Sequence, residues 1–226
     1  MTGKGKETEF KFRVDNQGDL DAVAKASSAT GAQAVHQENH FFDTKERLLD
    51  KNKYVLRLRQ EDSTFFLTAK GPSSSHQHGA LTAKAETERE INLAQATTIR
   101  DGRQSALKVL AEMPLEPDEK PLVDQMTKLL GATPLVHAGS FSNDRSRLTV
   151  PLQVGGQNVP VILELDRTTF PGAVVHYEIE VEVPSTVDAD GLGQALTALF
   201  ERAQVKTRNG PGKAKRFFAA MRGEKI

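Results

Sequence analysis

Charged and apolar residues alternate strictly along several short stretches of this chain, and this alternation limits the fold more than any other feature. The first stretch is residues 7–14, ETEFKFRV. Successive side chains of a β-strand point to opposite faces, so a strand here would have one face of Thr8 and apolar residues. Its other face would carry only ionised side chains, those of Glu7, Glu9, Lys11 and Arg13. A single strand of this kind is typical of a sheet with one solvated face.

Five further stretches repeat the pattern, each with charges of one sign. In each stretch, charged residues two positions apart would share one face of a strand. These groups are Arg57 and Arg59; Glu86, Glu88 and Glu90; Arg145 and Arg147; Glu164 and Asp166; and Glu178, Glu180 and Glu182. Like charges opposite one another on neighbouring strands destabilise a sheet. The six stretches together therefore favour a closed barrel with a charged lumen, its apolar faces turned outward against helices. A sandwich whose charges pair on its outer faces is the alternative.

Helices that could cover such a barrel are present in the sequence. We expect them at 18–30, ended by Gly31, at 100–131 and at 188–205, followed by a helical segment that begins at Pro211. Most of the remaining chain alternates as strands do, including a hairpin of 54–60 and 63–70. The predicted fold is α+β: an eight-stranded, mainly antiparallel β-barrel with a charged lumen and helices packed outside. We expect one domain over residues 1–226, with 100–131 as a helical insertion and 188–222 as C-terminal helices.

Composition excludes several kinds of site and partner. The 226 residues include 30 basic and 30 acidic side chains, so the whole molecule offers no net field for nucleic acid or an anionic membrane. The chain has no cysteine, which excludes disulfides, thiolate metal sites and cysteine nucleophiles. The first thirty residues lack the apolar core of a signal peptide, and no apolar run is long enough to span a bilayer. We therefore expect a cytoplasmic protein with no nucleic-acid or membrane partner.

A lumen with both signs of charge has a chemical use. Arginine and lysine can neutralise phosphate oxygens, arginine in a bidentate manner. Carboxylates on the same walls would repel a phosphate unless they held a divalent cation such as Mg²⁺ or Mn²⁺, which prefers oxygen ligands. Such a site suits metal-assisted phosphoryl or nucleotidyl transfer, and spacing alone does not choose between these reactions.

The order of the motifs resembles that of the CYTH family, the triphosphate tunnel metalloenzymes. It begins with the Glu-x-Glu-x-Lys pattern of residues 7–11 and continues with FFDT (41–44), LRLR (56–59), LTAK (67–70), TERE (87–90), RSR (145–147), LELD (163–166), YEIEVE (177–182) and GPGKAK (210–215). The resemblance extends from residue 7 to about residue 218. It implies an eight-stranded antiparallel tunnel with a charged lumen, which agrees with the fold expected from the residues.

The resemblance also implies roles for individual residues. The metal ligands would be Glu7, Glu9, Glu88, Asp166, Glu178 and Glu180. The residues that bind triphosphate would be Lys11, Arg57, Arg59, Lys70, Arg145, Arg147 and Lys213. The catalytic residues would be Glu9, Asp166, Glu178 and Glu180, the last three for a second metal or for orienting the attacking water. Three choices stay open, namely Arg145 or Arg147, Glu88 or Glu90, and Lys213 or Lys215.

The expected function is the Mg²⁺- or Mn²⁺-dependent hydrolysis of a small-molecule triphosphate, in which a metal-activated water attacks the terminal phosphate. Inorganic triphosphate is favoured over an organic one such as thiamine triphosphate. A class IV adenylyl cyclase is the alternative, because LTAKGP (67–72) resembles a motif of some such enzymes. A non-catalytic polyphosphate-binding module is disfavoured by the many carboxylates. The oligomeric state, monomer or homodimer, stays open, and we interpret His76 and His78 as solvated loop residues, not as a metal site.

Overall fold

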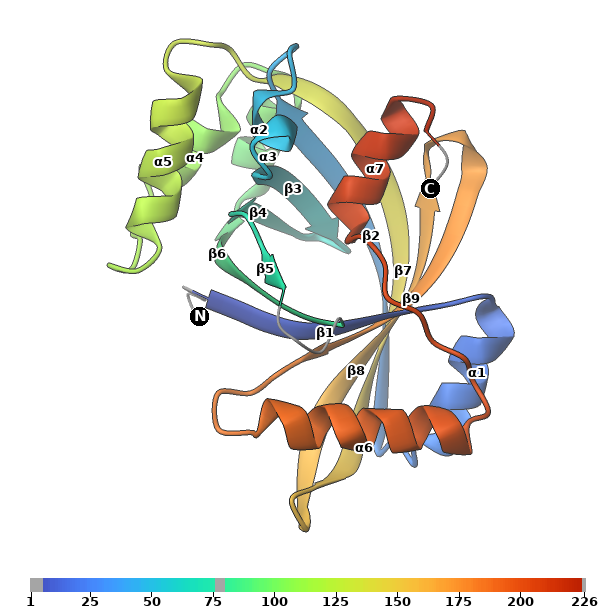
Figure 1. The fold of residues 1–226 in the computed structure, drawn as a ribbon. Coiled ribbons are helices and arrows are strands. Elements are labelled where there is room, and N and C mark those ends of the chain that lie inside the picture. Colours follow the sequence, from blue (N-terminus) through green and yellow to red (C-terminus); the bar gives the residue numbers. More distant parts are fainter. Residues whose placement is uncertain (1–5, 76–79, 225–226) are drawn as a thin grey trace.

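Eight antiparallel strands form a closed barrel in this computed structural model, which describes residues 6–75 and 80–224 (Figure 1). The strands are β1 Lys6–Val14, β2 Gly31–Asp43, β3 Val55–Glu61, β4 Thr64–Lys70, β6 Leu81–Ile91, β7 Val136–Val154, β8 Gln157–Phe170 and β9 Val174–Glu182. Their order around the barrel is β1-β9-β8-β7-β2-β3-β4-β6, and β6 pairs with β1 to close it. A two-residue strand, β5 (Ser74–Ser75), pairs with β6. The predicted fold class is confirmed.

The register of the strands decides which charges meet in the lumen. Lys11 of β1 lies opposite Glu180 of β9, and Arg145 of β7 lies opposite Asp166 of β8. At these places a block of one sign faces a block of the other sign, as cross-strand pairing favours. The β8–β9 pair is different, because Asp166 lies opposite Glu178. The barrel therefore brings carboxylates together at one place on its inner wall.

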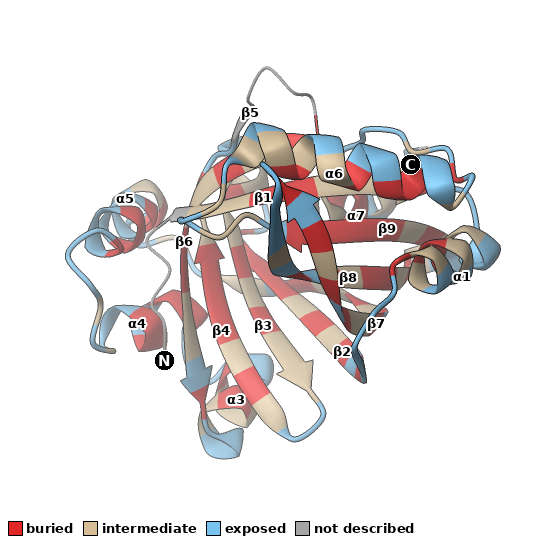
Figure 2. Ribbon diagram, turned by 90° about the horizontal axis from the view of Figure 1, so that it is seen from below, coloured by how far each residue is buried: buried red, intermediate tan, exposed pale blue. Residues whose placement is uncertain are grey.

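The alternate residues of the same strands form two apolar clusters outside the barrel, as predicted. The outer helices are α1 Gln17–Ala26, α2 Leu48–Lys51, α3 Leu93–Arg100, α4 Ala106–Ala111, α5 Lys120–Leu130, α6 Ala189–Arg202 and α7 Lys213–Met221. Phe10 and Ile179 pack with Leu196 under α1 and α6, whereas Leu67 and Met126 pack with α3, α4 and α5. Partly exposed and buried residues alternate over residues 55–59 of β3 and 64–67 of β4, the strands coloured by burial in Figure 2.

The first helix is shorter than predicted. It begins with an Asn16 capping box and ends at Ala26, not at residue 30. The Ser27 hydroxyl donates to the Ala24 carbonyl, and Ser28 has a positive φ of 55°. Gly31 is the first residue of β2, because the chain has already joined the β2–β7 ladder through the Thr30 amide.

The segment between β6 and β7 contains three short helices. The first, α3, begins before the predicted helical segment of 100–131, because an Asn92 capping box starts a helix directly after β6. The connection between α4 and α5 is held by Glu119, whose buried carboxylate accepts hydrogen bonds from the Arg89 guanidinium and the Glu116 amide. These helices pack on the outside of β3, β4 and β6.

Helix α7 lies across one end of the barrel, beside α2 (Figure 1). It begins at Lys213, two residues later than predicted. Its Phe217 ring stacks on Phe41 of β2, with ring centres 4.6 Å apart. Gly139 permits this approach, because a Cβ atom there would lie 3.0 Å from the Phe217 ring, and its φ of +128° suits glycine. Within the described residues, none of the helices combines the length and apolar character of a membrane span.

Candidate active site

A cavity of about 1110 Å³ occupies the barrel interior and extends to α2 and α7. Of the residues predicted as ligands or phosphate contacts, those lining it are Glu7, Glu9, Lys11, Arg57, Arg59, Lys70, Glu88, Arg145, Arg147, Glu180 and Lys213. Asp166 and Glu178 lie behind this wall, where both contact Lys213. The structure therefore brings all the predicted site residues to one cavity and its wall.

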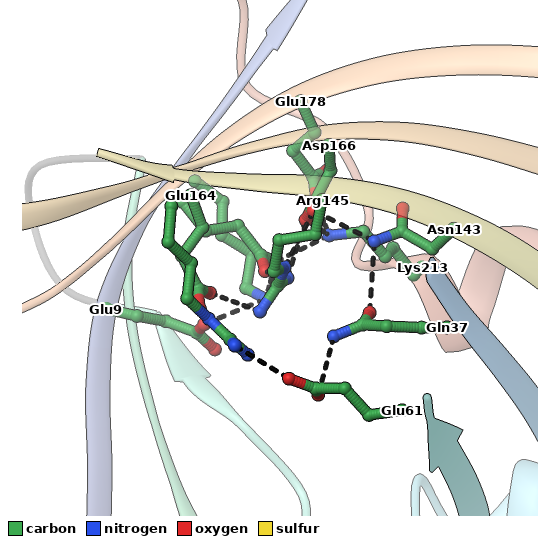
Figure 3. Close-up of polar contacts among 12 residues, drawn as sticks. Glu9, Gln37, Glu61, Asn143, Arg145, Glu164, Asp166, Glu178 and Lys213 are labelled. Carbon is green, nitrogen blue, oxygen red and sulfur yellow. Dashed lines mark hydrogen bonds and ion pairs between the residues drawn. The ribbon is translucent and has the colours of Figure 1, made fainter. Parts of the chain in front are cut away.

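Asp166, Glu178 and Glu180 form a compact acidic cluster. One carboxylate oxygen from each lies within 4.8 Å of the others, and all three side chains are buried. The Lys213 ammonium lies between them, 2.8 Å from Asp166, 2.6 Å from Glu178 and 3.0 Å from Glu180 (Figure 3). Three oxygen donors at this spacing fit a hard divalent cation such as Mg²⁺ or Mn²⁺.

The three carboxyl groups differ in their pKa because their cationic neighbours differ. Burial would raise the pKa of Asp166, but the charges of Arg145 and Lys213 outweigh burial and hold it below its usual value. The pKa of Glu180 is also lowered, since Lys11 and Lys213 together with Arg145 outweigh burial. Burial raises the pKa of Glu178, and the charge of Glu180 adds to the rise against the opposing charge of Lys213. Glu178 is therefore the member of the cluster that most readily holds a proton.

Arg145 joins the acidic cluster to the rest of the lumen. Its Nε donates to Asp166 Oδ1 at 2.7 Å, and its Nη2 donates to Asp166 and Glu180 at 2.6 and 2.7 Å. Arg147 lies one step further along β7 and contacts Glu61 at 2.6 Å and Glu164 at 3.1 Å. Both arginines line the cavity, and of the two only Arg145 contacts the acidic cluster.

The wall next to β9 is built from β1, β6 and β4. Lys84 lies 2.6 Å from Glu9 and 3.1 Å from Glu7, while Lys70 lies 2.6 Å from Glu86 and 3.2 Å from Glu7. No role was predicted for Lys84 or Glu86. β6 begins at Leu81, so Lys84 shares the inner face with Glu86, and this alternation was the sequence signal that could have identified Lys84.

Two of the open choices are distinguished by position. Glu88 accepts a hydrogen bond from Arg59 at 3.0 Å and from Thr68 at 2.7 Å, whereas Glu90 is exposed at the edge of the cavity. Lys213 enters the acidic cluster, whereas Lys215 is exposed at the mouth.

One buried arginine that contacts the cluster was not predicted. Arg216 of α7 is only 1% exposed, donates to Glu178 at 2.5 Å and lies 3.1 Å from Nδ1 of His176. No sequence pattern predicts that Arg216 is buried, because its burial results from the packing of α7 against the barrel. His76 and His78 lie outside the described residues.

A charged tunnel of eight antiparallel strands with a buried acidic cluster defines a known class of protein. The sequence model of the CYTH domain matches residues 5–217, and the chain belongs to the CYTH family. A search of curated proteins found no match.

Solved structures show the same fold over nearly the whole chain. A candidate adenylyl cyclase from Hippeastrum, described as having a dominant triphosphatase activity, is 21% identical with a TM-score of 0.76, over 97% of each chain. A candidate adenylate cyclase from Bacillus halodurans is 22% identical with a TM-score of 0.67, over 95% of this chain and 99% of the other. A protein from Pyrococcus horikoshii OT3 is 17% identical with a TM-score of 0.53. At these identities the comparisons establish the fold.

Proposed function

We propose that this protein is a divalent-metal-dependent triphosphatase, most suited to inorganic triphosphate or a small organic triphosphate. The observation that carries the proposal is the acidic cluster of Asp166, Glu178 and Glu180 beside basic side chains in one cavity. A site for phosphate alone would gain nothing from three buried carboxylates. Carboxylates and cations together are what a metal–triphosphate complex requires.

Asp166, Glu178 and Glu180 are the residues that would hold Mg²⁺ or Mn²⁺, and Glu7, Glu9 and Glu88 on β1 and β6 are further candidates. When bound, such a cation neutralises charge on phosphate oxygens and activates water for attack on the terminal phosphorus. The acidic oxygens left free would orient that water. The buried site also limits competing solvent, because Asp166 and Glu178 are at most 1% exposed.

The basic side chains of the lumen would hold the phosphates. Lys11, Arg57 and Arg59 each contact a carboxylate in the structure, Lys11 with Glu180 at 2.5 Å and Arg59 with Glu88 at 3.0 Å. A triphosphate would exchange these carboxylates for phosphate oxygens while the metal compensates the carboxylates. Charge that develops on the transferring phosphoryl group would then meet fixed cations, which is the main source of catalysis in phosphoryl transfer.

The reaction can be tested by product analysis. The purified protein is assayed with Mg²⁺ or Mn²⁺ on inorganic triphosphate, thiamine triphosphate and ATP. Orthophosphate released from inorganic triphosphate, abolished by a chelator, is the expected result. Cyclic AMP and pyrophosphate from ATP would instead establish the cyclase, an activity that appears in the descriptions of the Hippeastrum and Bacillus halodurans proteins. Tight triphosphate binding without turnover would establish a binding module.

Two substitutions separate the proposed roles of metal ligand and phosphate contact. Glu9 is buried and contacts Lys84 and Lys11 at 2.6 and 3.0 Å. Glu9→Gln should lower kcat by about 100-fold or more while the Kd for triphosphate changes far less, because it removes charge from the proposed metal site. Arg57→Ala should mainly weaken triphosphate binding. Near-normal activity of Glu9→Gln would exclude Glu9 as a metal ligand.

A further inference from the structure

The cations deep in the tunnel are neutralised by the protein itself. Lys70 and Lys84 contact Glu86 and Glu9 at 2.6 Å, and Lys213 contacts three carboxylates. A cation paired at this distance contributes little to the electric field a few nanometres outside the protein, because the two charges cancel. The lumen is therefore built to bind a polyanion that has arrived, and it attracts a distant one only weakly.

Uncompensated cations gather at one mouth. Lys51 of α2, Lys53 just after it and Lys215 of α7 are exposed and line the cavity. Within the part of the chain that the structure describes, none of the three lies in an ion pair. We call these three lysines the basic collar. An ion pair of 2.8 Å between Asp50 of α2 and Arg222, the residue after α7, links the two segments that carry the collar.

Exposed acidic side chains line the cavity toward the end of the barrel that lies away from the basic collar. Val55, beside the collar, pairs with Lys70, which pairs with Glu86. Glu90 lies further along the same ladder, opposite Phe66, toward the other end of the barrel. Glu90 and the neighbouring connection residue Glu116 are exposed and line the cavity there. The cavity thus has a basic end at α2 and α7, with exposed carboxylates toward its other end.

We propose that the basic collar is the entrance of the tunnel, where Lys51, Lys53 and Lys215 capture the anionic substrate by electrostatic attraction and pass it to the paired cations inside. The proposal rests on the proposed function in that the substrate is a polyphosphate anion. Cations at the mouth of a low-dielectric cleft focus the field and raise association rates by about 10-fold to 1000-fold at low salt. The effect should fall steeply as salt rises, since the screening length falls from about 30 Å at 0.01 M to about 3 Å at 1 M.

The test is a charge-neutralised variant, Lys51→Gln/Lys53→Gln/Lys215→Gln, measured in low and high salt. The matched control is Lys25→Gln/Lys108→Gln/Lys128→Gln, which removes the same charge from exposed lysines outside the cavity lining. The Kd for inorganic tripolyphosphate is measured by calorimetry with a chelator present, and kcat/KM with Mn²⁺. We expect the collar variant to lose about 10-fold in both at about 0.02 M salt and less than about 2-fold at about 0.5 M. Its kcat should be unchanged, and the control variant should resemble the wild type throughout.

The outcomes distinguish this proposal from the function on which it rests. The proposal that the collar is the entrance would be overturned if the two triple variants changed Kd and kcat/KM equally. It would also be overturned if the effect of the collar variant persisted at high salt. A wild-type protein that binds tripolyphosphate without hydrolysing it would overturn the triphosphatase, while the calorimetric comparison would still decide the entrance. A wild-type protein that does not bind tripolyphosphate would overturn both.

Discussion

The Nζ atom of Lys213 lies 2.6 Å from Oε1 of Glu178, at the centre of the acidic cluster. The same ammonium group reaches Asp166 at 2.8 Å and Glu180 at 3.0 Å. A lysine from the C-terminal helix thus compensates three carboxylates that belong to two neighbouring strands. Because the proposed metal ligands are these same oxygens, the lysine and a divalent cation compete for them, and a bound metal would free Lys213 to contact phosphate.

Replacing this lysine should separate metal binding from substrate binding. Lys213→Gln should bind Mn²⁺ more tightly than the wild type in the absence of substrate, because the internal competitor is gone. It should bind triphosphate more weakly and, in a chelator, should lose about 3 kcal/mol of stability, since three buried carboxylates lose a cation. Calorimetry with Mn²⁺ and thermal unfolding with and without Mn²⁺ check these points. A weaker Mn²⁺ affinity would contradict the competition.

The two lumen arginines should differ sharply in their effect on stability. Arg145→Met should lower the free energy of unfolding by about 3–5 kcal/mol, because the buried Asp166 and Glu180 both lose a cationic partner and keep only their lysine contacts. Arg147→Met should cost about 1 kcal/mol or less, since its side chain and that of Glu164 are each 25% exposed. Urea denaturation in a chelator measures both variants. Equal losses of unfolding free energy in the two variants would mean that the buried contacts of Arg145 stabilise the fold no more than the partly exposed contacts of Arg147.

The carboxyl group of Glu86 should make stability depend on pH near neutrality. Burial raises its pKa from 4.5 to about 7, and Glu7 adds to the rise against the charge of Lys70. A carboxyl whose pKa is higher in the folded state contributes stability that is complete below about pH 4.5 and lost as the pH rises through 7. Glu86→Gln mimics the protonated form and should escape this loss.

The comparison with wild type isolates that carboxyl group. The free energy of unfolding of Glu86→Gln minus that of the wild type should rise by about 2–3 kcal/mol between pH 5 and pH 8, given about 1.4 kcal/mol per unit of pKa shift. Denaturation at several pH values in a chelator gives the difference. The exposed Glu90→Gln serves as the control and should show no such trend. A difference independent of pH would show that Glu86 titrates in its ordinary range.

The buried contact between Arg89 and Glu119 should stabilise the helices between β6 and β7. Glu119→Ala removes the partner of Arg89 and the acceptor of the Glu116 amide, so we expect a loss of about 3 kcal/mol. Glu112→Ala is a suitable control, because its contact with Lys108 is 4.0 Å long and exposed, and it should cost less than about 0.5 kcal/mol. The melting temperatures of the two variants provide the measurement. A small effect of Glu119→Ala would mean that apolar packing alone holds α4 and α5.

The lumen residues were predictable from sequence because side chains on a strand alternate with a fixed period of two. That period placed Lys11 and Arg57 on the inner face without any knowledge of their neighbours. Helix boundaries were less predictable: α1 ends early because Ser28 adopts a left-handed conformation and β2 begins sooner than its apolar pattern suggests. Arg216 could not be predicted, since its contact with Glu178 exists only where α7 meets the barrel wall.

The sequence by itself determined the two faces of each strand, the signs of the charges on them and the apolar cover outside, because these follow from local alternation. The tertiary structure decided which charges meet. Asp166, Glu178 and Lys213 are far apart or on separate elements, and they converge because barrel closure fixes the register of β8 against β9 and lays α7 over one end. Register and helix docking depend on the packing of the whole chain, so no local pattern contains them.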